Sequence, residues 1–137
     1  MRARIAKANG AGYPWLVWED GGQVLGYAYA SQFRDRAAYR HSAEATVYLA
    51  PDATRRGIGS ALYRELIARL RAGGAHLVVG GVALPIEASV ALHEALGFTR
   101  VGTFSEIGRK FDRWIDVGFW QLRLDGGEPQ AADGATD

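Results

Sequence analysis

The sequence contains no cysteine, so disulfide bonds, thiolate metal ligands and cysteine nucleophiles are excluded. Its histidines, His41, His76 and His93, lack the spacing of a metal-binding motif such as HExxH, and we predict no metal site. No apolar run approaches the about 20 residues that a transmembrane helix requires. Residues 1–12 are basic but lack the apolar segment of a secretory signal. We therefore expect a cytoplasmic protein with no membrane partner.

The sequence also carries almost no net charge. Its 16 lysines and arginines nearly balance 15 aspartates and glutamates, which gives a formal charge of +1 at pH 7. Proteins that bind nucleic acids or anionic membranes typically show an excess of basic residues, so we expect neither partner. The 48% of hydrophobic and 23% of charged residues are typical of a globular protein. A chain of 137 residues forms one domain that can bury a core without crosslinks.

The spacing of the apolar residues predicts a mixed α/β domain. Three segments near the N-terminus alternate side-chain types as strands do, and two later segments have apolar residues at helical spacing. The predicted order β-β-β-α-β-α-β-β covers residues 13–124. Residues 1–12 precede it as a short N-terminal remnant. Residues 125–137 lack apolar periodicity and are predicted to be a disordered tail.

The most informative stretch is "ATVYLAPDATRRGIGSALYRELIARL", residues 45–70, in which a strand ends at Pro51 and a helix begins within a glycine-containing loop. Backbone N–H groups at a helix N-terminus attract anions, and Gly57 and Gly59 permit close approach of a ligand. The stretch matches neither the Walker loop nor the Rossmann fingerprint. From the loop alone, a phosphate-binding site and a tight left-handed turn before a helix are both open.

The rest of the chain favours the phosphate-binding interpretation. The segments "YPWLV", "GYAYA", "AYRHSAEATVYLAP", "GIGSALY", "SVALHEALGF" and "DVGFWQL" occur in the order in which they occur in the phosphinothricin and methionine sulfone acetyltransferases of the GNAT superfamily. The chain resembles this family from about Tyr13 to Leu124. The resemblance implies a GNAT-type mixed β-sheet flanked by helices. It also implies acetyl-CoA as co-substrate and direct acetyl transfer to the α-amine of a small amino acid or analogue.

The same resemblance implies two catalytic residues. Glu44, in "SAEATVYL", matches the general base of the family, and His93, in "VALHEALGF", stands where many relatives have a tyrosine that protonates the CoA thiolate. A histidine can donate or accept a proton near neutral pH. Each residue also has a purely structural interpretation. Glu44 fits a solvated carboxylate at a strand edge, and His93 fits a packed, hydrogen-bonded helix residue.

Binding residues follow from the resemblance as well. Arg36 and Tyr39 fall where the family binds its amino-acid substrate, although a solvated loop arginine is equally consistent with Arg36. Backbone groups of one strand are expected to hold the pantetheine arm, and the glycine loop is expected to hold the pyrophosphate. The implied cofactor-binding residues are Val47, Tyr48, Leu49, Arg55, Arg56, Gly57, Ile58, Gly59 and Ser60.

The sequence departs from the family in three places. Thr54 replaces the first Gln or Arg of the glycine loop, and Ile86 replaces an Asn that contacts the cofactor in relatives. The usual first strand and the two helices after it are also missing, because residues 1–12 are too few to supply them. We expect exposed apolar surface and an unpaired strand edge as a result. The chain would then start within a longer reading frame, or be a truncation completed by a partner.

The leading hypothesis is therefore an acetyl-CoA-dependent N-acetyltransferase for a small-molecule amine, acting as a homodimer formed through the last strand. One alternative is a CoA-binding but inactive truncated module. Another is an acetyltransferase for a larger amine, such as a peptide N-terminus or a polyamine. The sequence does not identify the acceptor or fix the oligomeric state.

Overall fold

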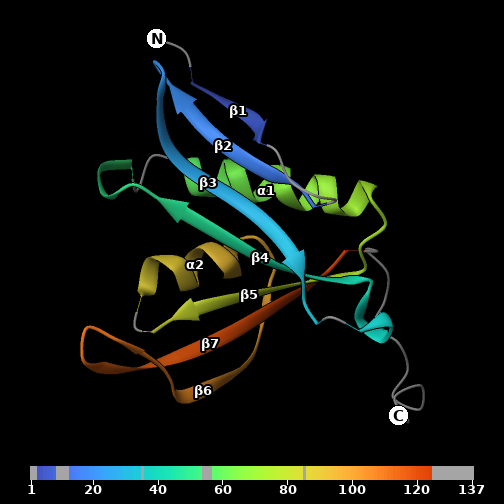
Figure 1. The fold of residues 1–137 in the computed structure, drawn as a ribbon, viewed down its shortest axis with the longest axis vertical. Helices are drawn as coiled ribbons and strands as arrows, with labels where there is room; N and C mark the ends of the chain where they lie inside the picture. Colours follow the sequence, from blue (N-terminus) through green and yellow to red (C-terminus); the bar gives the residue numbers. More distant parts are fainter. Residues whose placement is uncertain (1–2, 9–12, 35, 54–56, 85, 125–137) are drawn as a thin grey trace.

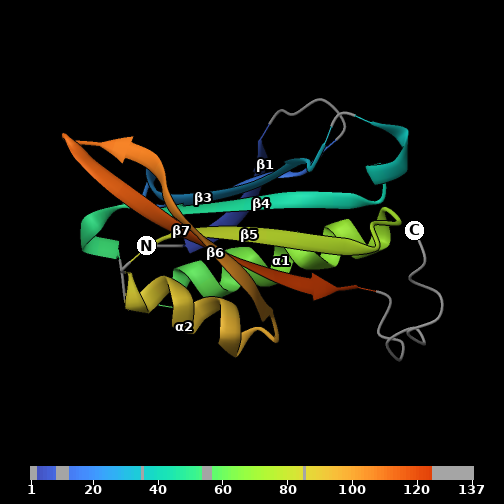
Figure 2. The same cartoon turned by 90° about the horizontal axis from the view of Figure 1, so that it is seen from below.

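The fold is a single mixed sheet with two helices on one face, as seen in a computed structural model (Figures 1 and 2). The structure describes residues 3–8, 13–34, 36–53, 57–84 and 86–124. The seven strands lie in the order β1-β2-β3-β4-β5-β7-β6. The strands are β1 (Ala3–Ala8), β2 (Trp15–Asp20), β3 (Gln23–Gln32), β4 (Ser42–Leu49), β5 (Leu77–Ala83), β6 (Thr99–Lys110) and β7 (Arg113–Arg123). The helices are α1 (Ile58–Ala72) and α2 (Glu87–Ala95), with 3₁₀ turns η1 (Ala37–Tyr39) and η2 (Pro51–Ala53).

The fold class predicted from the sequence is confirmed, but β1 corrects one detail. Residues 1–12 were expected to be too few to supply a first strand. Ala3–Ala8 nevertheless pairs antiparallel with β2, from Ala3 opposite Asp20 to Ala8 opposite Trp15. Six residues are enough, because a strand rises about 3.3 Å per residue and β2 is itself short. The described part of the chain has no helix between β1 and β2, and β1 covers the β2 edge that was expected to be unpaired.

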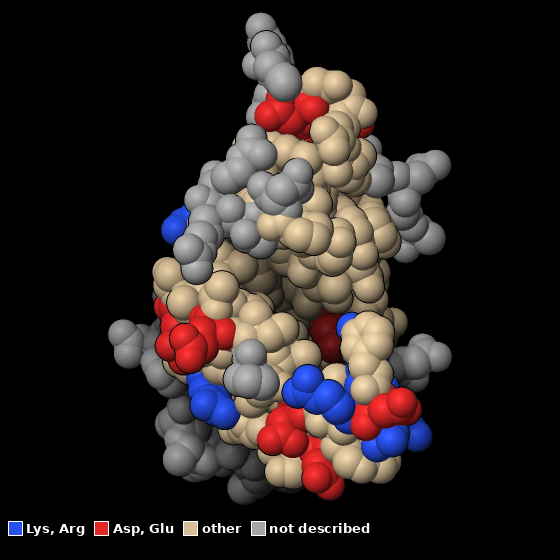
Figure 3. Space-filling view, turned by 90° about the vertical axis from the view of Figure 1, so that its left-hand side faces the viewer, with Lys and Arg blue, Asp and Glu red and all other residues tan. Residues whose placement is uncertain are grey.

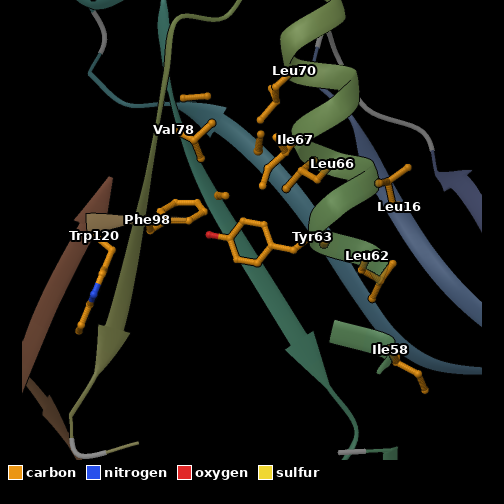
Figure 4. Packing of buried hydrophobic residues seen from close by; sticks show 14 of the residues in the cluster. Leu16, Ile58, Leu62, Tyr63, Leu66, Ile67, Leu70, Val78, Phe98 and Trp120 are labelled. Atoms are coloured by element: carbon orange, nitrogen blue, oxygen red, sulfur yellow. The ribbon is translucent and has the colours of Figure 1, made fainter. Parts of the chain in front are cut away.

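Helix α1 carries the main core of the domain (Figure 4). The predicted helical stripe is confirmed, since Ile58, Leu62, Leu66, Ile67 and Leu70 are all 7% exposed or less. Burying one such side chain contributes about 1.5–3 kcal/mol relative to leaving it in water. The sheet face under α1 consists largely of small residues, which lets the helix lie close to the strands. These residues are Ala28, Ala30, Ala43 and Ala45.

The opposite face of the sheet carries aromatic rings over β2, β3 and β4. Trp15 and Tyr29 stack with ring centroids 4.4 Å apart, and Tyr27 stacks on Tyr48 at 5.2 Å. The predicted alternation along β3 is confirmed, because Tyr27 and Tyr29 lie on this face while Ala28 packs under α1. The two faces of the sheet therefore have different surroundings: helices cover one, and the other is partly open.

Among the described residues, the large apolar side chains that are most exposed lie on the hairpin of β6 and β7. Phe111 is 87% exposed, Trp114 is 58% exposed, and Phe104 and Ile107 are each 55% exposed. This hairpin forms the sheet edge opposite β1, so its exposed side chains do not come from the N-terminal helices that the sequence lacks. Its turn uses left-handed dihedrals at Phe111 and at the residue after it, the geometry of a two-residue hairpin turn.

Candidate active site

The two central parallel strands separate partway along their length. β4 and β5 pair from Ser42 opposite Leu77 to Ala45 opposite Gly80, and the pairing ends there. β4 continues along β3 to Leu49, while β5 continues along β7. Their ends move apart in Figure 1, and the end of the molecule toward which they point is hollowed at its centre in Figure 3. Backbone groups of Thr46–Leu49 that face β5 have no ladder partner among the described pairings, so they can bind an extended ligand as an added strand would.

Val47, Tyr48 and Leu49, the predicted pantetheine-binding residues, all lie on this free edge. Val47 and Leu49 pack partly against the core. Tyr48 is 49% exposed and stacks on Tyr27 on the other face. The side chains therefore support the fold while the backbone edge stays available, as the sequence interpretation requires.

The glycine loop places the start of α1 beside the end of β4. Gly57 caps the helix with a φ of 78°, and it offers no side chain to bond the N–H groups of the first turn. A Cβ at Gly59 would lie 3.2 Å from Leu49 Cδ1, so glycine there lets α1 begin against β4. Uncapped N–H groups at a helix N-terminus suit a phosphate. Arg55 and Arg56 lie outside the described residues, as does Thr54.

Glu44 lies on the partly open face of the sheet. Its neighbours in sequence, Ala43 and Ala45, point under α1, so the half-buried Glu44 side chain points to the other side. Its cross-strand partners are Ser31 on β3 and Val79 on β5. Val79 lines an apolar cavity of about 370 Å³. The other lining residues are Phe33, Arg34, Val101, Gly102, Thr103, Phe104 and Phe119. Glu44 is thus the cross-strand neighbour of a residue that lines a space of the size of a small molecule.

Arg36 and Tyr39 lie on the loop between β3 and β4, and both are exposed. The Tyr39 ring meets the ring of Phe33 edge to face, with centroids 6.2 Å apart, and Phe33 lines the cavity beside Glu44. Tyr39 is therefore connected to the cavity through Phe33. Arg34, which also lines the cavity, was missed in the sequence.

His93 lies on the helix-covered face and is 5% exposed. Its Nδ1 is 2.8 Å from the Ser89 carbonyl oxygen, and its Nε2 is 2.9 Å from the Tyr63 hydroxyl. A carbonyl oxygen can only accept, so Nδ1 carries the hydrogen, and in the neutral ring Nε2 accepts from Tyr63. Burial lowers the pKa of His93, which the Ser89 bond partly offsets, and burial raises the pKa of Tyr63. At pH 7 the pair is a neutral imidazole and a protonated phenol.

Gly80 makes room for this pair at the point where β4 and β5 separate. A Cβ at Gly80 would lie 2.5 Å from His93 Nε2 and 2.8 Å from the Tyr63 hydroxyl oxygen. The rings of Phe98 and Trp120 complete the enclosure, with centroids 5.1 Å and 6.1 Å from that of His93. In Figure 4 the Tyr63 ring extends from α1 with its hydroxyl directed toward Phe98. Glu44 and His93 therefore lie on opposite faces of the sheet. Glu44 pairs with Val79, and His93 lies against Gly80, the next residue of β5.

Tyr63 had not been singled out as a site residue in the sequence. The available signal was a tyrosine adjacent to Leu62 on the buried stripe of α1, where its hydroxyl needs a partner. Ile86, the departure at the start of α2, is half exposed and caps the helix without a side-chain hydrogen bond.

Other features lie away from this site. A cavity of about 600 Å³ lies at the amino end of β4 and the C-terminal end of α1, and no predicted site residue lines it. In the described part of the chain, no cluster of metal-ligating side chains is found. None of the described helices is long and apolar enough to span a membrane.

Comparison with known proteins identifies the family. The sequence profile of the "Acetyltransferase (GNAT) family" matches residues 2–98. This chain belongs to the GNAT acetyltransferase family. It is 45% identical over 129 residues to a phosphinothricin N-acetyltransferase of Alcaligenes faecalis, with 93% of this chain and 66% of that protein covered. It is 40% identical over 114 residues to an L-methionine sulfoximine/L-methionine sulfone acetyltransferase of Salmonella typhimurium, with 83% and 67% covered.

The solved structures agree with the sequence relatives. A GNAT phosphinothricin acetyltransferase from Sinorhizobium meliloti, crystallised in complex with acetyl-CoA, matches with a TM-score of 0.79 and 42% identity. The match covers 88% of this chain and 68% of that one. This GNAT chain spans about two thirds or less of the length of the curated relatives that it matches.

Proposed function

We propose that this GNAT domain is an N-acetyltransferase that moves the acetyl group of acetyl-CoA to the α-amine of a small amino acid or analogue, of the phosphinothricin, methionine sulfone or methionine sulfoximine type. The observation that carries the proposal is the separation of β4 from β5 directly beside Glu44. The names of the relatives, and the acetyl-CoA bound to the Sinorhizobium enzyme, support the choice of substrates.

The residues present fit acetyl-CoA. The unpaired edge of β4 offers backbone donors and acceptors to the pantetheine arm, and the first turn of α1 offers N–H groups to the pyrophosphate. Gly57 leaves that turn open, since a Cβ there would meet no atom within 4 Å. Arg55 and Arg56 are proposed to add positive charge. When bound, acetyl-CoA supplies an electrophilic thioester, whose carbonyl oxygen a β4 backbone N–H can polarise.

The reaction needs two proton transfers, and we propose that they involve residues on opposite faces of the sheet. A free α-amine has a pKa of about 8, so at neutral pH it needs a base before it can attack. Glu44 is proposed to take that proton, because it lies on the partly open face beside the cavity that suits the acceptor. The departing thiolate needs a proton in turn. The sequence predicts His93 as its source. The structure offers His93 together with Tyr63 on the face of the sheet that α1 and α2 cover, which we call the sealed face.

Arg36 and Tyr39 are proposed to bind the acceptor, with Arg36 pairing with its α-carboxylate. The loop that carries them ends at the strand of Glu44, and Tyr39 contacts a wall residue of the cavity. Arg34 lines the cavity and offers a second cation. The apolar remainder of the lining suits the side chain of a small amino acid.

We also propose a homodimer formed through β6 and β7, in the cytoplasm, where acetyl-CoA is available. The exposed apolar side chains of this hairpin support the dimer, since exposed apolar surface of this kind marks an interface. Sedimentation of the purified protein should give the mass of two chains, and Trp114→Asp should give the mass of one. A single-chain mass for the unaltered protein would remove the dimer.

Acetyl transfer is tested by measuring CoA release from acetyl-CoA with phosphinothricin, methionine sulfone, methionine sulfoximine, a peptide N-terminus and a polyamine. We expect turnover with the first three amines, and mass spectrometry should show the acetyl group on the α-nitrogen. Turnover only with the larger amines would replace the proposed acceptor class. Calorimetric binding of CoA without turnover on any amine would show an inactive CoA-binding module instead.

A further inference from the structure

Tyr63 is a buried polar residue with a defined partner and no role so far. Its side chain is 1% exposed, on the face of α1 that packs against the sheet. A continuous hydrogen-bonded chain runs from Tyr63 O–H to His93 Nε2 and from His93 Nδ1–H to the Ser89 carbonyl oxygen. In this chain Nε2 has no hydrogen of its own. The only hydrogen located between the two side chains belongs to Tyr63.

We propose that the Tyr63 hydroxyl, and not the His93 imidazole, donates the proton to the departing thiolate, and that His93 is a positioning residue for Tyr63. This inference rests on the proposed acetyl transfer. His93 holds the hydroxyl through Nε2, and the Ser89 carbonyl holds the ring through Nδ1. In this arrangement one hydrogen bond orients the imidazole and a second lets the imidazole orient the hydroxyl, as in catalytic pairs of a hydroxyl and a histidine.

The position of the pair supports a role at the thioester sulfur. Both the Tyr63 hydroxyl and His93 Nε2 lie where a Cβ of Gly80 would be, and Gly80 is the last β5 residue that pairs with β4. The unpaired edge of β4, which fits the pantetheine arm, begins at the next residue after Ala45. The pair is therefore at the closed end of the gap between the strands, whereas Glu44 is on the other face at the same level.

The protons balance without another reactant. Tyr63 gives its phenolic hydrogen to sulfur as the C–S bond breaks with its electron pair left on sulfur. The substrate nitrogen loses two protons between ammonium and amide: Glu44 takes the first before attack, and the second restores the Tyr63 hydroxyl. His93 stays neutral throughout, with its hydrogen on Nδ1.

The surroundings of His93 keep it neutral. Trp120 packs against the ring from β7, and Phe98 packs against it from the loop between α2 and β6. Two charged groups beside this enclosure contact Trp120 rather than His93: Glu94 of α2 accepts from the Trp120 indole N–H at 3.2 Å, and Arg100 of β6 lies 5.2 Å from its ring centroid. Because burial lowers the pKa of His93, an imidazolium donor would already be lost below neutral pH. Burial raises the pKa of Tyr63, so its phenol stays protonated through neutral and mildly alkaline pH.

Two substitutions separate the donor from its support. Tyr63→Phe keeps the ring and removes the hydroxyl, and we expect kcat to fall about 100-fold or more, with KM for acetyl-CoA within about twofold. His93→Gln places an amide oxygen near the position of Nε2, which can still accept from Tyr63, so we expect a loss below about tenfold. Tyr13→Phe, which removes a hydroxyl at the distant cavity, is the control and should keep the unaltered rate. A larger loss for His93→Gln than for Tyr63→Phe would overturn the assignment.

Binding gives a readout that does not require turnover. A hydrogen-bond donor at the sulfur favours CoA over desulfo-CoA, and the preference grows at alkaline pH as the thiol of CoA ionises. By calorimetry we expect Tyr63→Phe to lose about tenfold in affinity for CoA and little for desulfo-CoA, while His93→Gln keeps most of the difference. Equal losses for both ligands would contradict a donor at the sulfur. If the unaltered protein binds both but acetylates nothing, the proposed function fails, and this comparison still shows whether Tyr63 contacts the sulfur.

The nitrogen resonances of His93 test the hydrogen-bonded chain itself. In the free protein at pH 7.5, ¹⁵N spectroscopy should show a protonated Nδ1 and an unprotonated Nε2. In Tyr63→Phe the Nε2 resonance should shift because its donor is gone. A protonated Nε2 in the unaltered protein would reverse the direction of the bond and exclude Tyr63 as the donor held by His93.

Discussion

The two faces of the sheet differ most at the point where β4 and β5 separate. On one face, Glu44 is half buried beside a cavity and an aromatic surface that the described helices leave uncovered. On the other, His93 and Tyr63 are enclosed by α1, α2, Phe98 and Trp120, and each polar atom has a partner. A group that exchanges protons with substrate and solvent needs access, whereas a group that serves a leaving sulfur benefits from the exclusion of water. The fold supplies both conditions at two adjacent residue pairs of β4 and β5, Glu44 with Val79 and Ala45 with Gly80.

The largest effect is expected from Gly80→Ala, which damages only the sealed face. The added Cβ would overlap His93 Nε2 and the Tyr63 hydroxyl, so the pair must separate. We expect activity to fall at least about 100-fold and the free energy of unfolding to drop by about 1–3 kcal/mol. Steady-state kinetics and chemical denaturation measure the two effects.

Gly81→Ala is the matched control, because Gly81 is the next residue and faces the other side. Its Cβ would lie 3.2 Å from Phe119 Cε1, so any change falls on the cavity face, where Phe119 is a lining residue, and leaves the contact between His93 and Tyr63 in place. A smaller loss of activity is expected. If both alanines cost the same, the enclosed pair is not what makes Gly80 necessary.

Glu44→Gln removes the proposed base on the partly open face and leaves the sealed face intact. We expect kcat/KM for the amine to fall about 10²- to 10⁴-fold, with CoA affinity unchanged within about twofold. The loss should shrink at high pH, where the amine is already neutral. Kinetics from pH 6.5 to 9.5 measure this, and Glu65→Gln, which alters only a surface ion pair on α1, is the control. An unaltered rate for Glu44→Gln would remove Glu44 from the mechanism.

A smaller effect is expected in the pH dependence of stability, because His93 is buried on the sealed face. Burial gives His93 a lower pKa in the folded protein than the 6.5 of a solvated histidine, so the unfolded chain binds more protons between these two values. The free energy of unfolding should therefore fall as the pH drops below 6.5, by at most about 1.4 kcal/mol per pH unit. Urea denaturation at pH 7.5 and 5.5 should show this decrease, and His93→Gln should show less of it. The same decrease in both proteins would mean that His93 does not cause it.

The sequence predicted the elements whose evidence is local. The apolar spacing from Ile58 to Leu70 was sufficient for α1, and the alternation of Tyr27 with Ala28 was sufficient for the faces of β3. Glu44 was identified by its resemblance to a family, and its position beside an apolar cavity is compatible with the expected role.

The remaining features depend on contacts between distant parts of the chain. Tyr63 and His93 are 30 residues apart, and they meet because Gly80, on a third element, has no side chain. The cavity beside Glu44 joins Phe33 to Phe104 and Phe119, which no local pattern connects. The strand β1 was missed because its short sequence pairs with a neighbour that only the folded sheet provides.

The central claim is that the backbone of β4 and of the glycine loop holds CoA, and amide hydrogen exchange tests it directly. Acetyl-CoA should slow exchange at the amides of Val47–Leu49 and Gly57–Ser60, while amides at the distant cavity near Gly73 stay unchanged. Saturating acetyl-CoA with no added protection in either segment would contradict the account.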